Sequence, residues 1–75
     1  MHYTVFCDNY RDVDIGDYIS YGIKFERSNC RHYIHDISVN QQFVKNMADL
    51  FNKYELEPEH FQDVVEDMLI QCFSI

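Results

Sequence analysis

The last third of the chain carries the strongest structural signal in the sequence, an apolar stripe at helical spacing. Seven apolar side chains recur there at intervals that place them on one face of an α-helix: Phe61, Val64, Val65, Met68, Leu69, Cys72 and Phe73. Acidic residues occupy the other side: Glu59, Asp63, Glu66 and Asp67. Pro58 suits the first helical position, where its missing N–H is not needed. The segment predicts a helix that is apolar toward a core and anionic toward solvent.

The segment before it predicts a second helix. Ser38 followed by Gln41 matches a capping box, in which the two side chains bond free N–H groups of the first turn. An apolar stripe at helical spacing follows: Phe43, Val44, Met47, Leu50, Phe51 and Tyr54. Leu56 in the short link should tuck beneath the joint. We therefore expect two neighbouring helices that are antiparallel or steeply crossed.

The first half of the chain predicts strands. Residues 3–7, 18–26 and 30–37 alternate and are rich in β-formers, whereas residues 8–17 are polar and predict a loop or a wide hairpin connection. Alternation in the third run is ambiguous, and we favour Ile34 facing inward with Ile37 at the strand's end. The order predicts one α+β domain over residues 1–75: a three-stranded antiparallel sheet (β-β-β) followed by two helices packed on one face.

Charge is unevenly distributed along this acidic chain, whose formal net charge is −7. Residues 55–75 contain six acidic residues and no lysine or arginine, and residues 8–17 contain four aspartates and one arginine. Direct phosphate binding needs a basic footprint, which is missing, so nucleic acid is not an expected ligand. A protein with a basic surface is the expected partner.

The three cysteines indicate a reducing compartment. Cys7, Cys30 and Cys72 form no Cys-x-x-Cys pair, and an odd number cannot all pair within one chain. We expect free, buried thiols in a cytoplasmic protein. The first residues show no basic segment followed by a long apolar run, so neither secretion nor a membrane partner is expected.

Three stretches of the sequence resemble a known family. They are Tyr21-Gly22-Ile23, Asp36-Ile37-Ser38, and the run from Leu56 through Pro58 and His60 to Asp67. Over residues 18–69 the chain is similar to a small uncharacterised domain-of-unknown-function family of Gram-positive anaerobes. Glu57 departs from the family pattern, which has a serine N-cap there. The resemblance implies a fold arrangement and no assigned activity.

Metal and catalytic motifs are incomplete. The run from Asp12 to Asp17 is not an EF-hand, because Gly16 stands where a third oxygen ligand is needed and Ile23 where the loop needs a glutamate. His32 and His35 lie on opposite faces of a predicted strand. We expect no metal site and no cofactor.

Two further pairings carry little chemistry. His60 and Asp63 share a helix face but lack a third ligand of fixed position. Cys7 and Cys30 could approach His2 or His32 across the sheet, yet a chain this short can hardly fill a core and also line a substrate cleft. We predict that the protein is not an enzyme.

The acidic side of the last helix is the main candidate for a binding surface. Its carboxylates would face an arginine- and lysine-lined groove, joined by aspartates of the polar loop: Glu59, Asp63, Glu66, Asp67, Asp12, Asp14 and Asp17. Ile70 interrupts the polar side as an interface anchor would. The alternative is a solvated face that keeps a small protein soluble.

Two functions are consistent with these features. The first is a non-catalytic protein-binding module. Its sharper version is an inhibitor that occupies the nucleic-acid channel of a host enzyme, as phage anti-CRISPR and other anti-defence proteins do. The alternative is a self-associating structural or regulatory protein. Its homodimer would close through exposed apolar residues, among them Ile70, Ile75 and some of Tyr10, Tyr18 and Tyr33.

Overall fold

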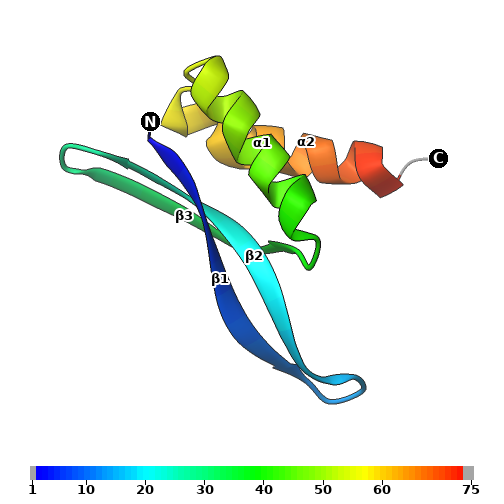
Figure 1. The fold of residues 1–75 in the computed structure, drawn as a ribbon. Coiled ribbons are helices and arrows are strands. Elements are labelled where there is room, and N and C mark those ends of the chain that lie inside the picture. Colours follow the sequence, from blue (N-terminus) through cyan, green and yellow to red (C-terminus); the bar gives the residue numbers. More distant parts are fainter. Residues whose placement is uncertain (1, 74–75) are drawn as a thin grey trace.

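The computed structural model describes residues 2–73, and side chains up to Gln71. The elements are β1 (Tyr3–Asp12), β2 (Gly16–Arg27), β3 (Cys30–Ser38), α1 (Gln41–Lys53), the short 3-10 helix η1 (Pro58–His60) and α2 (Phe61–Phe73). The strands form one antiparallel sheet in the order β1-β2-β3, and both helices lie over one face of it (Figure 1). The α+β arrangement predicted from the sequence is therefore confirmed.

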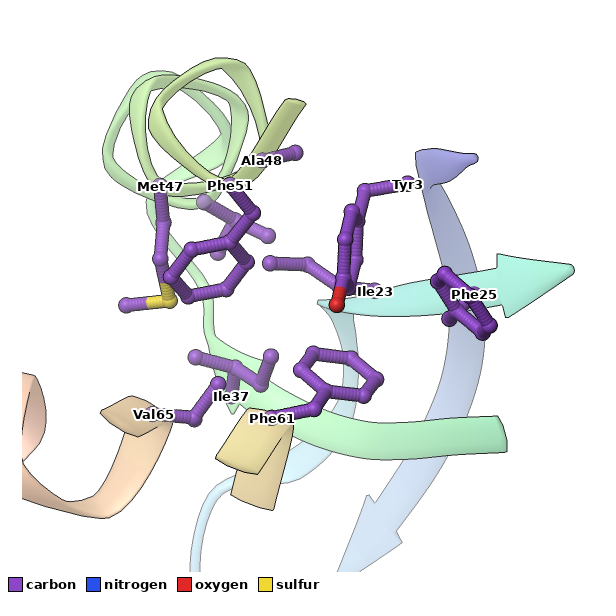
Figure 2. Close-up of a cluster of buried hydrophobic side chains, with 10 residues drawn as sticks. Tyr3, Ile23, Phe25, Ile37, Met47, Ala48, Phe51, Phe61 and Val65 are labelled. Carbon is purple, nitrogen blue, oxygen red and sulfur yellow. The ribbon is translucent and has the colours of Figure 1, made fainter. Parts of the chain in front are cut away.

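The core lies between the sheet and the two helices, and Tyr3 is at its centre (Figure 2). The Tyr3 ring centroid lies 4.9 Å from that of Phe25 on β2, 5.4 Å from Phe51 on α1 and 5.1 Å from Phe61 on α2. One residue of β1 thus contacts the neighbouring strand and both helices. The buried apolar residues are Tyr3, Ile23, Phe25, Ile37, Val44, Met47, Ala48, Phe51, Phe61 and Val65.

β1 and β2 are longer than the sequence predicts. Their pairing runs without a break from Tyr3↔Phe25 to Asp12↔Gly16, so most of the expected loop at residues 8–17 is strand. Cross-strand pairs stabilise this part in place of a core. The rings of Tyr10 and Tyr18 stack at 5.6 Å. We call residues 8–20 the hairpin arm, which extends past the region that the helices cover (Figure 1).

A bulge of two extra residues in β3 interrupts the pairing of β2 with β3. Tyr21 pairs with Ser38 but Ile23 pairs with Ile34, so two steps along β2 correspond to four along β3. Asp36, within the bulge, has a φ of 54°. A Cβ atom on Gly22 would lie 2.3 Å from the Ile34 carbonyl oxygen, so only glycine fits at this position.

The inward residues of β3 agree with prediction. Ile34 packs against the core, and Ile37 is buried near the strand's end. The bulge accounts for the ambiguous alternation of this strand, because it changes which residues face the helices.

α1 begins two residues later than predicted, because its N-cap is Asn40 and not Ser38. The Asn40 side-chain oxygen accepts a hydrogen bond from the Phe43 N–H at 3.1 Å, and Asn40 is the N-cap. The Ser38 hydroxyl oxygen instead accepts from the Asn40 N–H at 3.0 Å, so the predicted capping box with Gln41 is wrong. The apolar stripe is only partly buried, because Leu50 and Tyr54 are 43% and 71% exposed.

α2 follows a single turn of 3-10 helix. Pro58 occupies the start of η1, and the Glu57 side chain makes no capping bond. Leu56, in the link before η1, is half-buried against the core as expected. The predicted stripe faces the core: Phe61 and Val65 are buried, and Val64, Met68 and Leu69 pack beside them. Cys72, Phe73 and Ile75 lie outside the described side chains. No helix within residues 2–73 has the length and apolarity needed to cross a membrane.

Candidate functional site

The acidic side of η1 and α2 is exposed, as the spacing predicts. Four carboxylates point away from the buried Phe61 and Val65: Glu59, Asp63, Glu66 and Asp67. We call these residues, with Ile70, the acidic helix face. In the part of the chain with described side chains, no lysine or arginine forms an ion pair with any of them. Their negative charge therefore faces solvent without internal neutralisation.

Two of these carboxylates have a polar side chain nearby. Glu66 accepts a hydrogen bond from the Gln62 side-chain amide at 3.3 Å, and Glu59 lies 4.0 Å from His60 Nε2. Ile70 is 64% exposed and follows Glu66 by one helical turn. The face thus combines negative charge with one accessible apolar side chain.

Two of the three aspartates at the β1–β2 turn form hydrogen bonds or an ion pair within the hairpin. The Asp12 carboxylate accepts hydrogen bonds from the N–H groups of Asp14 at 2.7 Å and Ile15 at 3.3 Å, which shapes the turn. Asp17 pairs with Arg11 at 3.1 Å, and both side chains are exposed. Of the three, only the Asp14 carboxylate has no hydrogen bond or ion pair within the described structure.

The structure does not bring these aspartates to the acidic helix face. Figure 1 shows the β1–β2 turn at the far end of the hairpin arm, well away from α2. The sequence-predicted site therefore divides into two surfaces. The acidic helix face keeps Glu59, Asp63, Glu66, Asp67 and Ile70, and the hairpin turn carries Asp12, Asp14 and Asp17.

The helix-free face of the sheet carries an aromatic cluster that the sequence pattern did not predict. The Phe6 ring centroid lies 6.2 Å from Tyr33 and 5.1 Å from His35, and His35 Nδ1 lies 3.4 Å from an Asp8 carboxylate oxygen. The alternation of Thr4, Phe6, Asp8 and Tyr10 signals this face once β1 is extended to Asp12.

The two tyrosines of the hairpin arm sit in a negative environment. The Tyr18 hydroxyl donates to the Asp36 carboxylate at 3.3 Å. Partial desolvation raises the pKa of Tyr18, and the negative charge of Asp36 adds to the rise. The pKa of Tyr10 is raised by desolvation and by the charges of Asp8 and Asp36. This end of the sheet is thus aromatic and electronegative.

A polar clamp joins the start of β1 to the end of α1. The Asn52 side-chain oxygen accepts from the Tyr3 N–H at 2.9 Å, and its Nδ2 donates to the Tyr3 carbonyl oxygen at 2.8 Å. The Tyr3 hydroxyl donates to the Leu56 carbonyl oxygen at 2.6 Å. Burial, reinforced by Glu57 and opposed by Arg27, raises the pKa of Tyr3 to about 12.

A pocket of about 420 Å³ lies beside this clamp. Its lining mixes one arginine, Arg27, with the carboxylates of Glu55 and Glu57. Because both signs of charge line the pocket, the lining indicates neither an anion nor a cation as its ligand. The pocket therefore adds no ligand class to the candidate surfaces.

The cysteines and histidines form no ligand cluster within the described part of the chain. Cys30 Sγ lies 3.1 Å from His32 Nε2, and Cys30 is half-buried. Cys7 is exposed, so the expectation of a buried thiol is wrong there, because its side chain lies on the part of β1 that the helices leave uncovered. Within residues 2–73, no group of three or more histidine, cysteine, aspartate or glutamate side chains is placed to hold a metal ion.

Comparison with known proteins gives one match. A model described as a family of unknown function (DUF6514) matches residues 1–71. No curated protein and no solved structure matches the chain. The surfaces described above are therefore the basis for inferring what the protein does.

Proposed function

The chain belongs to this family of unknown function (DUF6514), and we propose that it is a non-catalytic protein-binding module whose acidic helix face docks on a basic surface of a partner protein. One observation carries the proposal. The carboxylates of Asp63, Glu66 and Asp67 are exposed on one side of α2, and no described lysine or arginine pairs with them.

Charge of this kind favours a basic partner in two ways. It speeds diffusional encounter with a surface of opposite sign, and it penalises acidic partners. Ile70 supplies an accessible apolar side chain at the same place, where interfaces commonly bury an anchor. The net charge of −7 acts in the same direction over a longer range.

The sharper form of the proposal is an inhibitor that occupies a nucleic-acid-binding groove. Carboxylates spaced along one side of a helix offer an arginine- and lysine-lined groove the same charge as a phosphate backbone. Phage anti-CRISPR and other anti-defence proteins are proteins of this kind. The partner would then lose its nucleic acid when this chain binds.

Charge reversal at the acidic helix face tests the proposal. The immobilised chain captures partners from a lysate of the native host, and a salt gradient elutes them because ions screen exposed charges. The triple variant Asp63→Lys, Glu66→Lys and Asp67→Lys should lose the salt-sensitive partner. Retention of that partner by the triple variant would contradict the proposal.

A matched control separates location from net charge. The variant Asp14→Lys, Asp49→Lys and Glu55→Lys also replaces three carboxylates by three ammonium groups, so its net charge changes equally, but these residues lie outside α2. It should keep the partner. If the control loses the partner to the same extent, net charge rather than the acidic helix face governs binding.

For the sharper form, the captured partner should release a labelled oligonucleotide when the chain is added.

Self-association is the second candidate, and exposed apolar side chains favour it. Val13, Ile15 and Ile70 are 99%, 72% and 64% exposed. A homodimer that covers such residues would add buried area to a small core. Sedimentation velocity at micromolar concentration tests it, and a strict monomer would exclude it.

A further inference from the structure

β1 is an edge strand, and its pairing register determines which backbone groups point away from the sheet. The Glu26 N–H donates to the His2 carbonyl oxygen at 3.0 Å, whereas the His2 N–H donates to the Asn52 side-chain oxygen at 3.2 Å. His2 and Glu26 therefore occupy a hydrogen-bonded position of the ladder and form one of its two bonds. Hydrogen-bonded and non-hydrogen-bonded pairs alternate along an antiparallel ladder, and the β1–β2 register has no break. Even-numbered residues of β1 therefore bond β2, and odd-numbered residues direct N–H and C=O outward.

The Asn52 side chain bonds the first outward-directed N–H and C=O groups, which belong to Tyr3. Its side-chain amide accepts from the Tyr3 N–H and donates to the Tyr3 carbonyl oxygen, as the backbone of a neighbouring strand would. These bonds agree with the alternation, because they show Tyr3 directing its groups away from β2. Tyr3 is therefore the last residue of this edge whose outward backbone groups are bonded by the clamp.

The outward groups beyond Tyr3 are open. They belong to Val5, Cys7, Asn9 and Arg11, and none forms a hydrogen bond within residues 2–73. Figure 1 shows β1 on the outside of the sheet with no further strand beside it in the described chain. We call residues 5–11 the open edge. Such a row of unpaired N–H and C=O groups is a template for an additional strand.

Within the open edge the Arg11 charge is paired with a carboxylate, so the charge of Asp8 favours a basic strand. Asp8, whose side chain is 48% exposed, lies on the helix-free face, and Asp12 follows on the same face at the end of β1. Val5 and Cys7 lie on the other face. A residue opposite Asp8 is stabilised if it is positively charged, and apolar residues suit the positions beside Val5 and Cys7.

The same charges disfavour a second copy of this chain. Antiparallel pairing of two open edges over their full length is centred on Asp8, because Val5 then faces Arg11 of the other copy. That register places two Asp8 carboxylates directly opposite each other, and like charges in this position are destabilising. A partner of opposite charge avoids this repulsion.

We propose that the open edge binds an extended segment of a partner protein by strand addition, with lysine or arginine side chains toward Asp8 and apolar side chains toward Val5 and Cys7. Backbone hydrogen bonds to Val5, Cys7, Asn9 and Arg11 provide the attachment, and the alternation of the segment provides the specificity. This inference goes beyond the proposed function, because it uses a surface other than the acidic helix face.

Amide hydrogen exchange measured by NMR tests the proposal directly. In the free protein, the amides of Cys7, Asn9 and Arg11 should exchange faster than those of Phe6 and Asp8, which bond β2. An eight-residue peptide that alternates lysine and valine should slow exchange at the open edge by about tenfold or more at saturation. A peptide that alternates glutamate and valine should leave exchange unchanged.

Asn9 offers a matched pair of variants. Asn9→Pro removes one outward N–H that the β1–β2 ladder does not use, and proline is tolerated at such positions of edge strands. Asn9→Ala keeps the N–H. The alanine variant should retain peptide protection and the proline variant should lose it, while protection of Phe6 and Asp8 remains in both.

Asp8→Lys provides a second route if proline disrupts the hairpin arm. In this variant the lysine–valine peptide should no longer protect the open-edge amides, and the glutamate–valine peptide should protect them. The proposal is overturned if the lysine–valine peptide protects no open-edge amide, or if both peptides protect equally. It is also overturned if protection rises with protein concentration alone, which would identify a second copy as the occupant.

Failure here is distinguishable from failure of the proposed function. The triple variant Asp63→Lys, Glu66→Lys and Asp67→Lys leaves the open edge intact. It should still show lysine–valine protection of Cys7 and Asn9, whatever the outcome of partner capture.

Discussion

The covered part of the sheet and the hairpin arm are made from the same two strands, yet different forces hold them. Beneath the helices, Ile23 and Phe25 are 0% and 1% exposed, whereas Ile19, on the same face of β2, is 53% exposed. Burial of apolar area stabilises the first region. Ladder hydrogen bonds and cross-strand side-chain pairs hold the second, as in an isolated hairpin.

The residues that stabilise the fold and the residues that are accessible to a partner therefore lie in different parts of the sheet. Substitutions in the covered part should change the free energy of unfolding, because side chains there contact both helices. Substitutions of exposed side chains in the hairpin arm should change the free energy of unfolding little and should mainly affect binding. Expected losses of stability therefore decrease from the covered part to the tip of the arm.

Gly22→Ala should have the largest effect. The added Cβ would meet the Ile34 carbonyl oxygen at 2.3 Å and the Phe6 ring at 2.8 Å, so the bulge must shift. We expect the free energy of unfolding to fall by about 3 kcal/mol. Urea denaturation followed by circular dichroism measures it.

Gly16→Ala is the control at the tip of the hairpin. Gly16 has a φ of 83° but nothing lies within 4 Å of an added Cβ. Its cost is therefore backbone strain alone, about 1 kcal/mol. A Gly22→Ala variant that is no less stable than Gly16→Ala would contradict the close packing of β3 over Gly22.

Tyr3→Phe should have an intermediate effect. It removes the hydroxyl that donates to the Leu56 carbonyl oxygen, and loss of such a bond costs about 1 kcal/mol. The ring contacts with Phe25, Phe51 and Phe61 remain, so the fold should be kept. Chemical denaturation at neutral pH measures the difference.

The same residue should make stability depend on alkaline pH. The Tyr3 pKa is raised from 10.0 to about 12 in the folded protein, so the unfolded state loses its proton first. This contribution is fully present below pH 10 and is lost as pH rises toward about 12. Tyr3→Phe should show a shallower loss over that interval. Equal slopes for both proteins would contradict the role assigned to burial.

Val13→Ser with Ile15→Ser should have the smallest effect. Both side chains lie in the β1–β2 turn and are 99% and 72% exposed. We expect the free energy of unfolding to change by less than about 0.5 kcal/mol. The denaturation midpoint measures it, and a larger loss would show that the turn packs against something, a second copy included.

Helical periodicity predicted the covered part well. Phe61 and Val65 are buried because a period of about 3.6 residues is fixed by helix geometry alone. The hairpin arm was missed because its stabilising pair, Tyr10 with Tyr18, becomes visible only when the register is known. Ser38 and Asn40 are both good caps, and local sequence does not decide between them.

The candidate surfaces divide in the same way. The spacing of Asp63, Glu66 and Asp67 places them together on a helix without tertiary information. The separation of Asp14 from α2 depends on where the hairpin points. Asn52 contacts Tyr3 across 49 residues of sequence, and no periodicity signals a contact of that range.

The bulge also marks where the hairpin arm leaves the three-stranded part of the sheet. β3 leaves the sheet at Ser38, which pairs with Tyr21, and the chain then enters α1. Residue pairs inserted or deleted near Val13 would lengthen or shorten the projecting ribbon and leave that exit where it is. The length of the hairpin arm and the packing of the core can therefore be varied independently, and a protein engineer can change the length without repacking the core.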